Sequence, residues 1–339
     1  MSINRTSSTI TIDSTRSTVA ALPDLVGFTP EHSLVVIYLA GNSVIVTARS
    51  DVHTRWHLTA GEIASTGKGV GADGAILIVC STRGDSLQLP WLGEIAETGR
   101  SCELAGIQVR ESLLVDGDQF WTYDGAHSGR VSVEGHSIER ECPSPITAVA
   151  IPKHQLPATS RAAFISRYQR RPDLEPSRAA FEAAVGEVVS IAVRAEQAWT
   201  DVCELAFSLE ADSGSELLLA RLQLAMQDVR IRDLILCRVS EAELGQHGLV
   251  DAIVRAALSA PEQLRPRVAG AAAALLAAIE GNSVAAECLI EVAQGDSLAV
   301  LTATSVRAAL PPSMLREVFA SAKPEVLSQL SAAGEDSAG

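Results

Sequence analysis

The chain has 339 residues, of which 47% are hydrophobic and 20% charged, and its formal net charge is −14. This composition is typical of a globular protein with one large domain or two ordinary ones. The charge argues against direct nucleic-acid binding, which needs clustered cations, because the only lysines are Lys68, Lys153 and Lys323.

Other bulk features argue against export and against a membrane segment. No basic start is followed by an apolar core, so we expect no secretory signal. The most apolar run, Val268 to Ile279, is shorter than the roughly 20 residues that cross a bilayer. The six cysteines are scattered and form no C-x-x-C pair, which favours reduced, structural thiols in a cytoplasmic protein. We therefore expect no metal site, no cofactor and no membrane contact.

The first elements in chain order alternate between helices and strands. Residues 14–26 have a helical apolar pattern that follows Asp13 and is interrupted by Pro23. Residues 33–39 are apolar without alternation, as in a strand buried on both faces. A Gly-Asn turn at 41–42 leads to a strand at 44–48, and a helix near 58–65 then precedes a strand at 75–80.

The next elements complete a sheet. Residues 89–105 fit an amphipathic helix, and 107–115 alternate as a strand. Asp116-Gly117 predicts a turn into a returning strand at 119–123, so the sheet should be mixed. Residues 124–158 are rich in Gly, Ser and Pro and predict loop, with at most a short strand near 131–133.

From residue 159 the pattern is helical almost without a break. A long helix is expected at about 177–209, and shorter helices follow with short turns, as in paired antiparallel helices. The breaks between them fall at 212–214, 245–248, 260–261, 281–283, 295–296 and 311–312.

The sequence therefore predicts an α/β or α+β N-terminal half, with a mixed β-sheet and flanking helices, and an all-helical, repeat-like C-terminal domain. The predicted domains are 1–158, with 1–8 disordered, and 159–331. The polar tail 332–339 is also expected to be disordered.

None of the chemical motifs in the sequence has the neighbouring elements or residues that its chemistry requires. Residues 69–74 match G-x-G-x-x-G, but the glycines follow a helix and precede a strand, the reverse of a dinucleotide site. His53 and His57 have helical spacing, yet no third metal ligand is evident. Cys142 lies among loop histidines without any sign of an activated thiolate. Trp121 and Tyr123 share one face of a strand, where they pack in a hairpin or form a wall for a ligand or partner.

Three segments together resemble a known family. Residues 27–35 read G-F-T-P-E-H-S-L-V, residues 116–123 read D-G-D-Q-F-W-T-Y, and Ser160-Arg161 begins a helix. This set is similar to a family of actinobacterial and actinophage proteins that share a domain of unknown function. The resemblance implies an α/β front and a helical back but no activity. The helical half lacks a tryptophan that the family has before the position of Gly281.

The absence of a complete catalytic set favours a non-enzymatic interaction or regulatory protein with a protein partner. The alternative is an enzyme or small-molecule sensor with its site in the α/β half, where α/β sheets place ligands in loops next to buried strands. The candidate binding residues are Gly27, Phe28, Pro30, Ser33, Arg49, Asp51, Asp116, Trp121, Tyr123 and Arg161.

Overall fold

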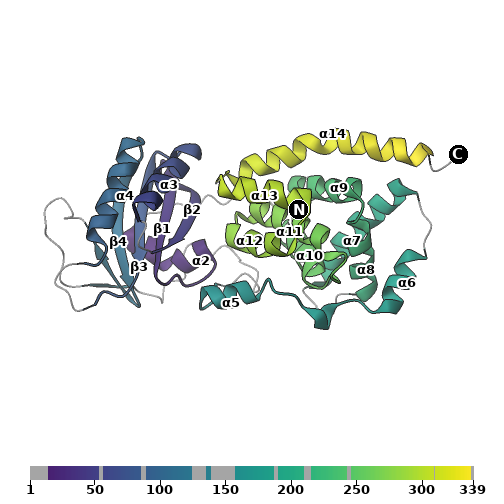
Figure 1. Ribbon diagram of the computed structural model, residues 1–339, viewed down its shortest axis with the longest axis horizontal. Helices are drawn as coiled ribbons and strands as arrows, with labels where there is room; N and C mark the ends of the chain where they lie inside the picture. Colours follow the sequence, from purple (N-terminus) through teal and green to yellow (C-terminus); the bar gives the residue numbers. More distant parts are fainter. Residues whose placement is uncertain are drawn as a thin grey trace, which may run out of the picture. The chain divides into compact units, whose positions relative to one another are not determined.

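The computed structural model of the protein divides into two compact units, residues 1–164 and 165–339, which we call the α/β unit and the helical unit (Figure 1). It describes residues 14–52, 56–84, 89–123, 135–138, 157–186, 190–209, 215–242, 246–308 and 310–336. Within these residues, no helix is both long and apolar enough to cross a membrane.

The α/β unit contains a six-stranded sheet in the order β2-β1-β3-β4-β5-β6. Only β3 and β4 are parallel, and every other neighbouring pair is antiparallel, which confirms the predicted mixed sheet. The predicted strand near 131–133 lies outside the described residues. The strands are β1 (Ser33–Ala40), β2 (Ser43–Asp51), β3 (Gly74–Cys80), β4 (Gln108–Asp116), β5 (Gln119–Thr122) and β6 (His136–Ser137).

Helices cover both faces of the sheet, which explains the apolar runs of β1 and β3. On one face, α3 (Trp56–Gly69) and α4 (Leu92–Leu104) pack on even-numbered residues of β1 such as Leu34 and Tyr38. The Tyr38 hydroxyl donates a hydrogen bond of 2.7 Å to the carbonyl of Ile63 in α3. The short helices α1 (Thr15–Ala20) and α2 (Leu22–Val26) lie on the other face, where the Thr15 hydroxyl donates to Glu111 of β4.

Two expected helices are each broken in two. The expected helix 14–26 is α1 and α2, because the chain turns at Ala21 and Pro23 occupies the first turn of α2. The expected helix 177–209 is α6 (Arg178–Val185), which ends at Gly186, and α7 (Ile191–Ser208). The Ser190 side chain accepts a hydrogen bond from the Val193 amide and so caps the start of α7.

The C-terminal end corrects a further expectation. Helix α14 (Pro312–Asp336) continues through residues 332–336, which the polar composition had assigned to a disordered tail. Its last residues extend a helix whose Val326 and Leu330 are already buried, so each added residue gains a helical hydrogen bond at little cost. Residues 1–8 and 337–339 lie outside the described residues.

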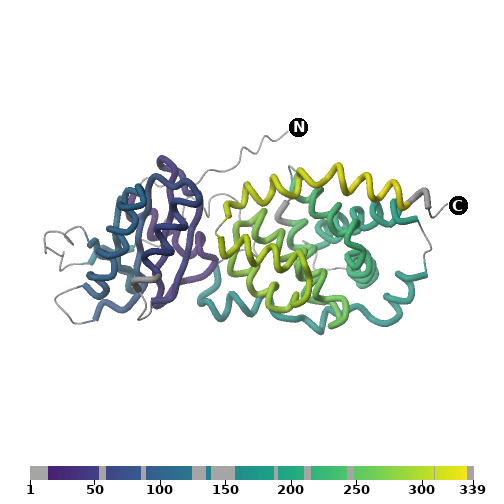
Figure 2. Tube along the Cα trace, turned by 45° about the horizontal axis from the view of Figure 1, so that its top comes forward, coloured from purple at the N-terminus to yellow at the C-terminus, as the bar shows by residue number. Residues whose placement is uncertain are grey.

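The helical unit is built around α11 (Arg265–Leu275), which contacts α9, α10, α12 and α13. Residues 268–275 are buried on every side, and the small alanines allow neighbouring helices to approach closely. Helix α14 lies along α9 (Figures 1 and 2). The other helices are α5 (Arg161–Ser166), which contains the boundary between the units, α8 (Glu216–Ala225), α9 (Val229–Glu241), α10 (Gln246–Leu258), α12 (Ser283–Val292) and α13 (Ser297–Arg307), with short η2 (Pro172–Leu174) and η4 (Leu276–Glu280).

Candidate functional site

Polar groups from several strands lie together at one end of the sheet. Because β3 and β4 are parallel, their carboxyl ends lie at this same end, and the antiparallel neighbours begin or end there too. The register aligns Asp51 of β2 with Ser33 of β1, Ser33 with Cys80 of β3, and Cys80 with Val115 of β4. This row is where a ligand would be expected on an α/β sheet.

Arg49 organises the β1–β2 part of this row. Its Nε donates a hydrogen bond of 2.9 Å to Ser33 Oγ, and its terminal nitrogen forms an ion pair with Asp51. The Ser33 hydroxyl donates in turn to the carbonyl of Glu31 at 2.5 Å. The serine proton is therefore committed to a main-chain acceptor. We call Ser33, Arg49 and Asp51 the arginine clamp.

An aromatic platform lies beneath the arginine clamp. The Arg49 guanidinium is 5.8 Å from the centre of the Phe28 ring, and the Phe28 and Phe164 ring centres are 5.5 Å apart. The main chain of Phe28 pairs with Ala158. Gly27 has φ +88°, and a side chain there would lie 2.8 Å from the Phe164 ring. The segment 157–164 thus belongs to the α/β unit and covers the G-F motif.

Two other candidate residues flank this platform without joining the arginine clamp. Pro30 is buried in the turn before β1, where it helps to fix the path of the chain into the strand. Arg161 is exposed at the start of α5. Among the described residues, no ion pair links Arg161 to the acidic group of the clamp, Asp51.

Cys80 lies beside Ser33 on the same face of the sheet, and sequence reasoning had treated it only as a core residue. Burial raises the pKa of its thiol to about 12, while the positive charge of Arg49 acts in the opposite direction. The thiol is therefore protonated at neutral pH and is a poor nucleophile. The sequence could have indicated this position, because Cys80 is the last residue of a buried strand and therefore lies at the carboxyl end of the sheet.

The other candidate residues lie on the opposite face of the sheet. Asp116 accepts a hydrogen bond of 2.8 Å from the Arg83 amide, and the Arg83 guanidinium is 5.9 Å from the Trp121 ring centre. The Tyr123 hydroxyl donates to the carbonyl of Pro90 at 2.6 Å, and burial raises its pKa. Trp121 Nε1 is buried without a hydrogen-bond partner among the described residues. Tyr123 is thus a neutral structural donor.

The register explains why the candidate residues form two groups. Side chains alternate between faces along a strand, and Asp116 follows Val115, which is in register with Cys80. Asp116, Trp121 and Tyr123 therefore share the face of α4, whereas the arginine clamp shares the face of α1 and α2. The two groups therefore lie on opposite faces of the sheet.

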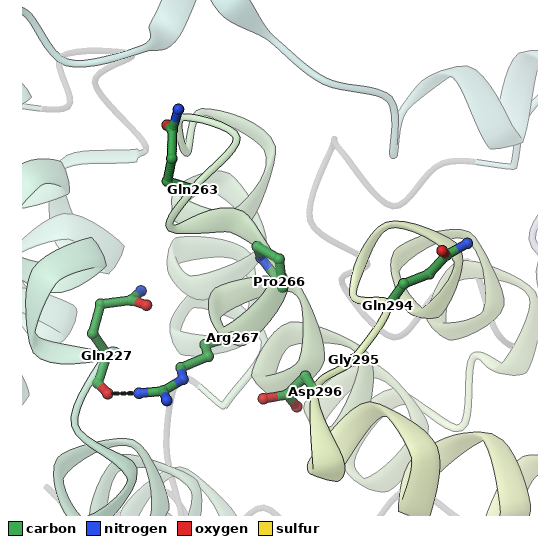
Figure 3. A pocket seen from close by; sticks show the side chains of 7 residues that line it. All are labelled: Gln227, Gln263, Pro266, Arg267, Gln294, Gly295 and Asp296. Atoms are coloured by element: carbon green, nitrogen blue, oxygen red, sulfur yellow. Dashed lines mark hydrogen bonds between the residues drawn. The ribbon is translucent and has the colours of Figure 1, made fainter.

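A cavity of about 440 Å³ lies in the helical unit, at the start of α11 and of α13 (Figure 3). The Arg267 side chain is directed to the main-chain carbonyl of Gln227, to which it donates a hydrogen bond. Asp296 accepts from the Ala299 amide and pairs with buried Arg232, so its charge is also satisfied. The lining residues are Gln227, Gln263, Pro266, Arg267, Gln294, Gly295 and Asp296.

Those sequence motifs that fall within the described residues lie between the helices and strands that were predicted around them. The glycines of residues 69–74 follow α3 and precede β3, an order that cannot place a helix N-terminus on a pyrophosphate. His53, Cys142 and the loop histidines His127 and His154 lie outside the described residues. Within the described part of the chain, no three His, Cys, Asp or Glu residues are placed to hold a metal ion.

Comparison with known proteins identifies a family. The model of a domain of unknown function, DUF4192, matches residues 16–313 and so spans most of both units. The chain belongs to this family. No curated protein and no solved structure matches the chain significantly. The resemblance drawn from the three sequence motifs is thus confirmed at the level of a domain of unknown function, and the DUF4192 match assigns no activity.

Proposed function

We propose that this DUF4192 protein is a non-catalytic interaction or regulatory protein that binds a partner through its helical unit. The observation that carries the proposal is an exposed apolar surface on α14, combined with polar groups in the arginine clamp that satisfy one another. A catalytic site would need at least one nucleophile, acid or base poised for a substrate.

The chemistry of the α/β unit supports a structural role for its polar residues. The Arg49 charge is neutralised by Asp51, and the Ser33 hydroxyl donates one hydrogen bond and accepts another. Burial raises the pKa of Cys102 to about 11, so this thiol, like that of Cys80, is protonated at neutral pH. Groups in these states hold the fold together and have no spare capacity for proton or acyl transfer.

The apolar surface lies on the side of α14 that faces away from the unit's core. Met314, Val318 and Ala322 are exposed and spaced four residues apart, so they share one face, which we call the outer face of α14. The same row continues to Val326 and Leu330, which are buried, so the exposed apolar part of the row lies in the first half of α14. Exposed apolar side chains grouped in this way commonly mark protein-binding surfaces.

Charge indicates the kind of partner. The chain carries a net charge of −14, and Glu317 is exposed next to the outer face of α14. A partner with an apolar strip and basic flanks would be attracted at long range and then held by apolar contact. The free cysteines Cys80, Cys102, Cys203, Cys237 and Cys288 fit a reducing cytoplasm. The excess of arginine over lysine and the many alanines fit a GC-rich actinobacterial or phage gene.

The test compares two double variants of the full chain in affinity purification from its native cells. Met314→Glu with Val318→Glu places two charges on the outer face of α14. The control, Ser313→Glu with Ser331→Glu, adds the same charge at exposed positions of the same helix that lie away from the outer face. A partner should co-purify with the wild type and the control and be lost with the first variant.

Two outcomes would overturn the proposal. One is a set of co-purifying proteins that the first variant leaves unchanged. The other is a metabolite that raises the melting temperature of the protein and is turned over by it, because a turnover reaction would make the protein an enzyme.

A further inference from the structure

We propose that the outer edge of β2 binds an extended basic segment of a partner protein as an added β-strand. This inference rests on the proposed function in that it requires a protein partner. The site lies in the α/β unit and binds through main-chain hydrogen bonds, whereas the proposed function rests on an apolar face of α14 in the helical unit. An experiment can therefore contradict one proposal and leave the other standing.

Strand β2 is the edge of the sheet and is nine residues long. Among the described residues it pairs with β1 alone. The amide of Val52 donates to the carbonyl of His32 at 3.0 Å, which sets the phase of the antiparallel ladder. Hydrogen-bonded and non-bonded pairs alternate, so Ser50 and Ala48 turn their main-chain groups toward β1.

The intervening residues, Thr47 and Arg49, turn their main-chain N–H and C=O groups away from β1. No hydrogen bond to these groups occurs within the described residues. Proteins usually protect such edges with lysine, proline or a bulge. β2 contains neither lysine nor proline, and its one irregularity lies between the pairs Tyr38–Val46 and Leu39–Val44. The stretch from Val46 to Asp51 is regular and can accept a further strand.

The two faces of β2 define the side chains that an added strand should carry. On the face of α3, Val46, Ala48 and Val52 are partly buried and apolar, so alternate residues of the segment should be apolar. On the other face, Asp51 pairs with Arg49 yet its carboxylate side chain remains 65% exposed. The residue of the segment that lies opposite Asp51 should therefore be basic, in line with the chain's acidic balance.

The same charge argues against a second copy of the chain as the added strand. Two copies that each carry −14 repel each other, and pairing of β2 with β2 about Thr47 would place Asp51 opposite Ser43. In that register the pair gains no ion pair at Asp51 to offset the repulsion. A basic strand gains one at Asp51 and is attracted before contact.

The test uses the full chain and a synthetic peptide of alternating valine and lysine that matches the length of β2. In the free protein, the amide hydrogens of Thr47 and Arg49 should exchange fast and those of Ala48 and Ser50 slowly, as measured by NMR hydrogen exchange. The peptide should slow exchange at Thr47 and Arg49. A peptide with glutamate in place of lysine should leave both fast.

N-methylation of the peptide separates strand addition from simple charge attraction. Methyl groups on the amides that face β2 should weaken binding by about tenfold or more, since the lost hydrogen bonds are each worth about 1 kcal/mol. The same number of methyl groups on the alternate amides should change it by about twofold or less. Equal effects of the two patterns would overturn the inference.

A variant pair checks the edge from the protein side. Thr47→Pro removes an amide that the fold does not use and blocks the edge with its ring, whereas Thr47→Val keeps the amide. Thr47→Pro should abolish peptide binding and retain the circular dichroism spectrum, and Thr47→Val should bind as the wild type. Slow exchange at Thr47 and Arg49 in the free protein, or light scattering that shows a dimer lost on Thr47→Pro, would mean that the edge is already occupied and would overturn the inference.

Discussion

Arg49 Nε donates a hydrogen bond of 2.9 Å to the hydroxyl of Ser33, across the antiparallel pair β1–β2. Ser33 is wholly buried and begins β1, while Arg49 lies near the end of β2. The contact therefore fixes the point where the G-F-x-P loop enters the sheet. It also gives the G-F-x-P-x-x-S motif a structural reason, because its serine is needed to receive the arginine.

We expect Arg49→Ala to destabilise the α/β unit by about 2 kcal/mol, because it leaves a buried hydroxyl lone pair unsatisfied and removes packing on Phe28. Urea denaturation, followed by circular dichroism, measures the change. Arg161→Ala is the matched control, since Arg161 is exposed, and it should alter the unfolding free energy by less than about 0.5 kcal/mol. Equal losses in the two variants would show that the clamp contributes nothing.

The elements that the sequence predicts well are those with a strong period or a strong turn. β1 and β3 were predictable because buried strands have continuous apolar runs, and the turn before β5 was predictable from Asp116-Gly117. The break between α6 and α7 was not predictable from the sequence. Both helices have the same period, and the residues that separate them, Gly186 to Ser190, differ little from helix composition.

The grouping of the candidate residues was harder to predict than their identity. Ser33, Arg49 and Asp51 do meet, because the Gly41-Asn42 turn folds β2 back on β1. The separation of Asp116 from Arg49 depends on which residues of β3 and β4 stand in register. A one-residue shift would reverse it, and no short sequence pattern fixes the register of a parallel pair joined through a helix.

Gly27→Ala should destabilise the α/β unit more than Gly41→Ala. Both glycines have positive φ, but a Cβ at Gly27 would lie 2.8 Å from Phe164, whereas Gly41 has open space around it. Backbone strain alone costs about 1 kcal/mol, and steric overlap in a packed core typically adds about 1–3 kcal/mol. Thermal unfolding of the two variants measures the difference. The same melting temperature in both would show that the Phe164 ring moves away freely.

Arg232→Ala should strongly destabilise the helical unit. The Arg232 side chain is 5% exposed and pairs with Asp296 at 3.2 Å, and Asp296 also caps α13. Removal of the arginine leaves a buried carboxylate without its counter-charge, which typically costs about 3–5 kcal/mol. Arg178→Ala is the control, because Arg178 is almost fully exposed and its ion pair with Glu182 should contribute under about 0.5 kcal/mol. Chemical denaturation of both variants gives the comparison.

Stability should fall in alkali because two thiols are buried in the α/β unit. Burial raises the pKa of Cys80 to about 12 and that of Cys102 to about 11, whereas an unfolded thiol has a pKa near about 8.5. The folded state therefore retains protons that the unfolded state has lost. The stabilisation is fully present below about pH 8.5 and is lost as the pH rises through the two folded values.

Between about pH 9 and pH 10, each thiol should lower the unfolding free energy by up to about 1.4 kcal/mol per pH unit. Cys80→Ala and Cys102→Ala should each make this decline shallower, and the double variant should reduce it by the sum of the two. Urea denaturation at several pH values below 10 gives the slopes before tyrosine ionisation contributes. A slope unchanged in the double variant would show that these thiols ionise as easily in the folded chain as in the unfolded one.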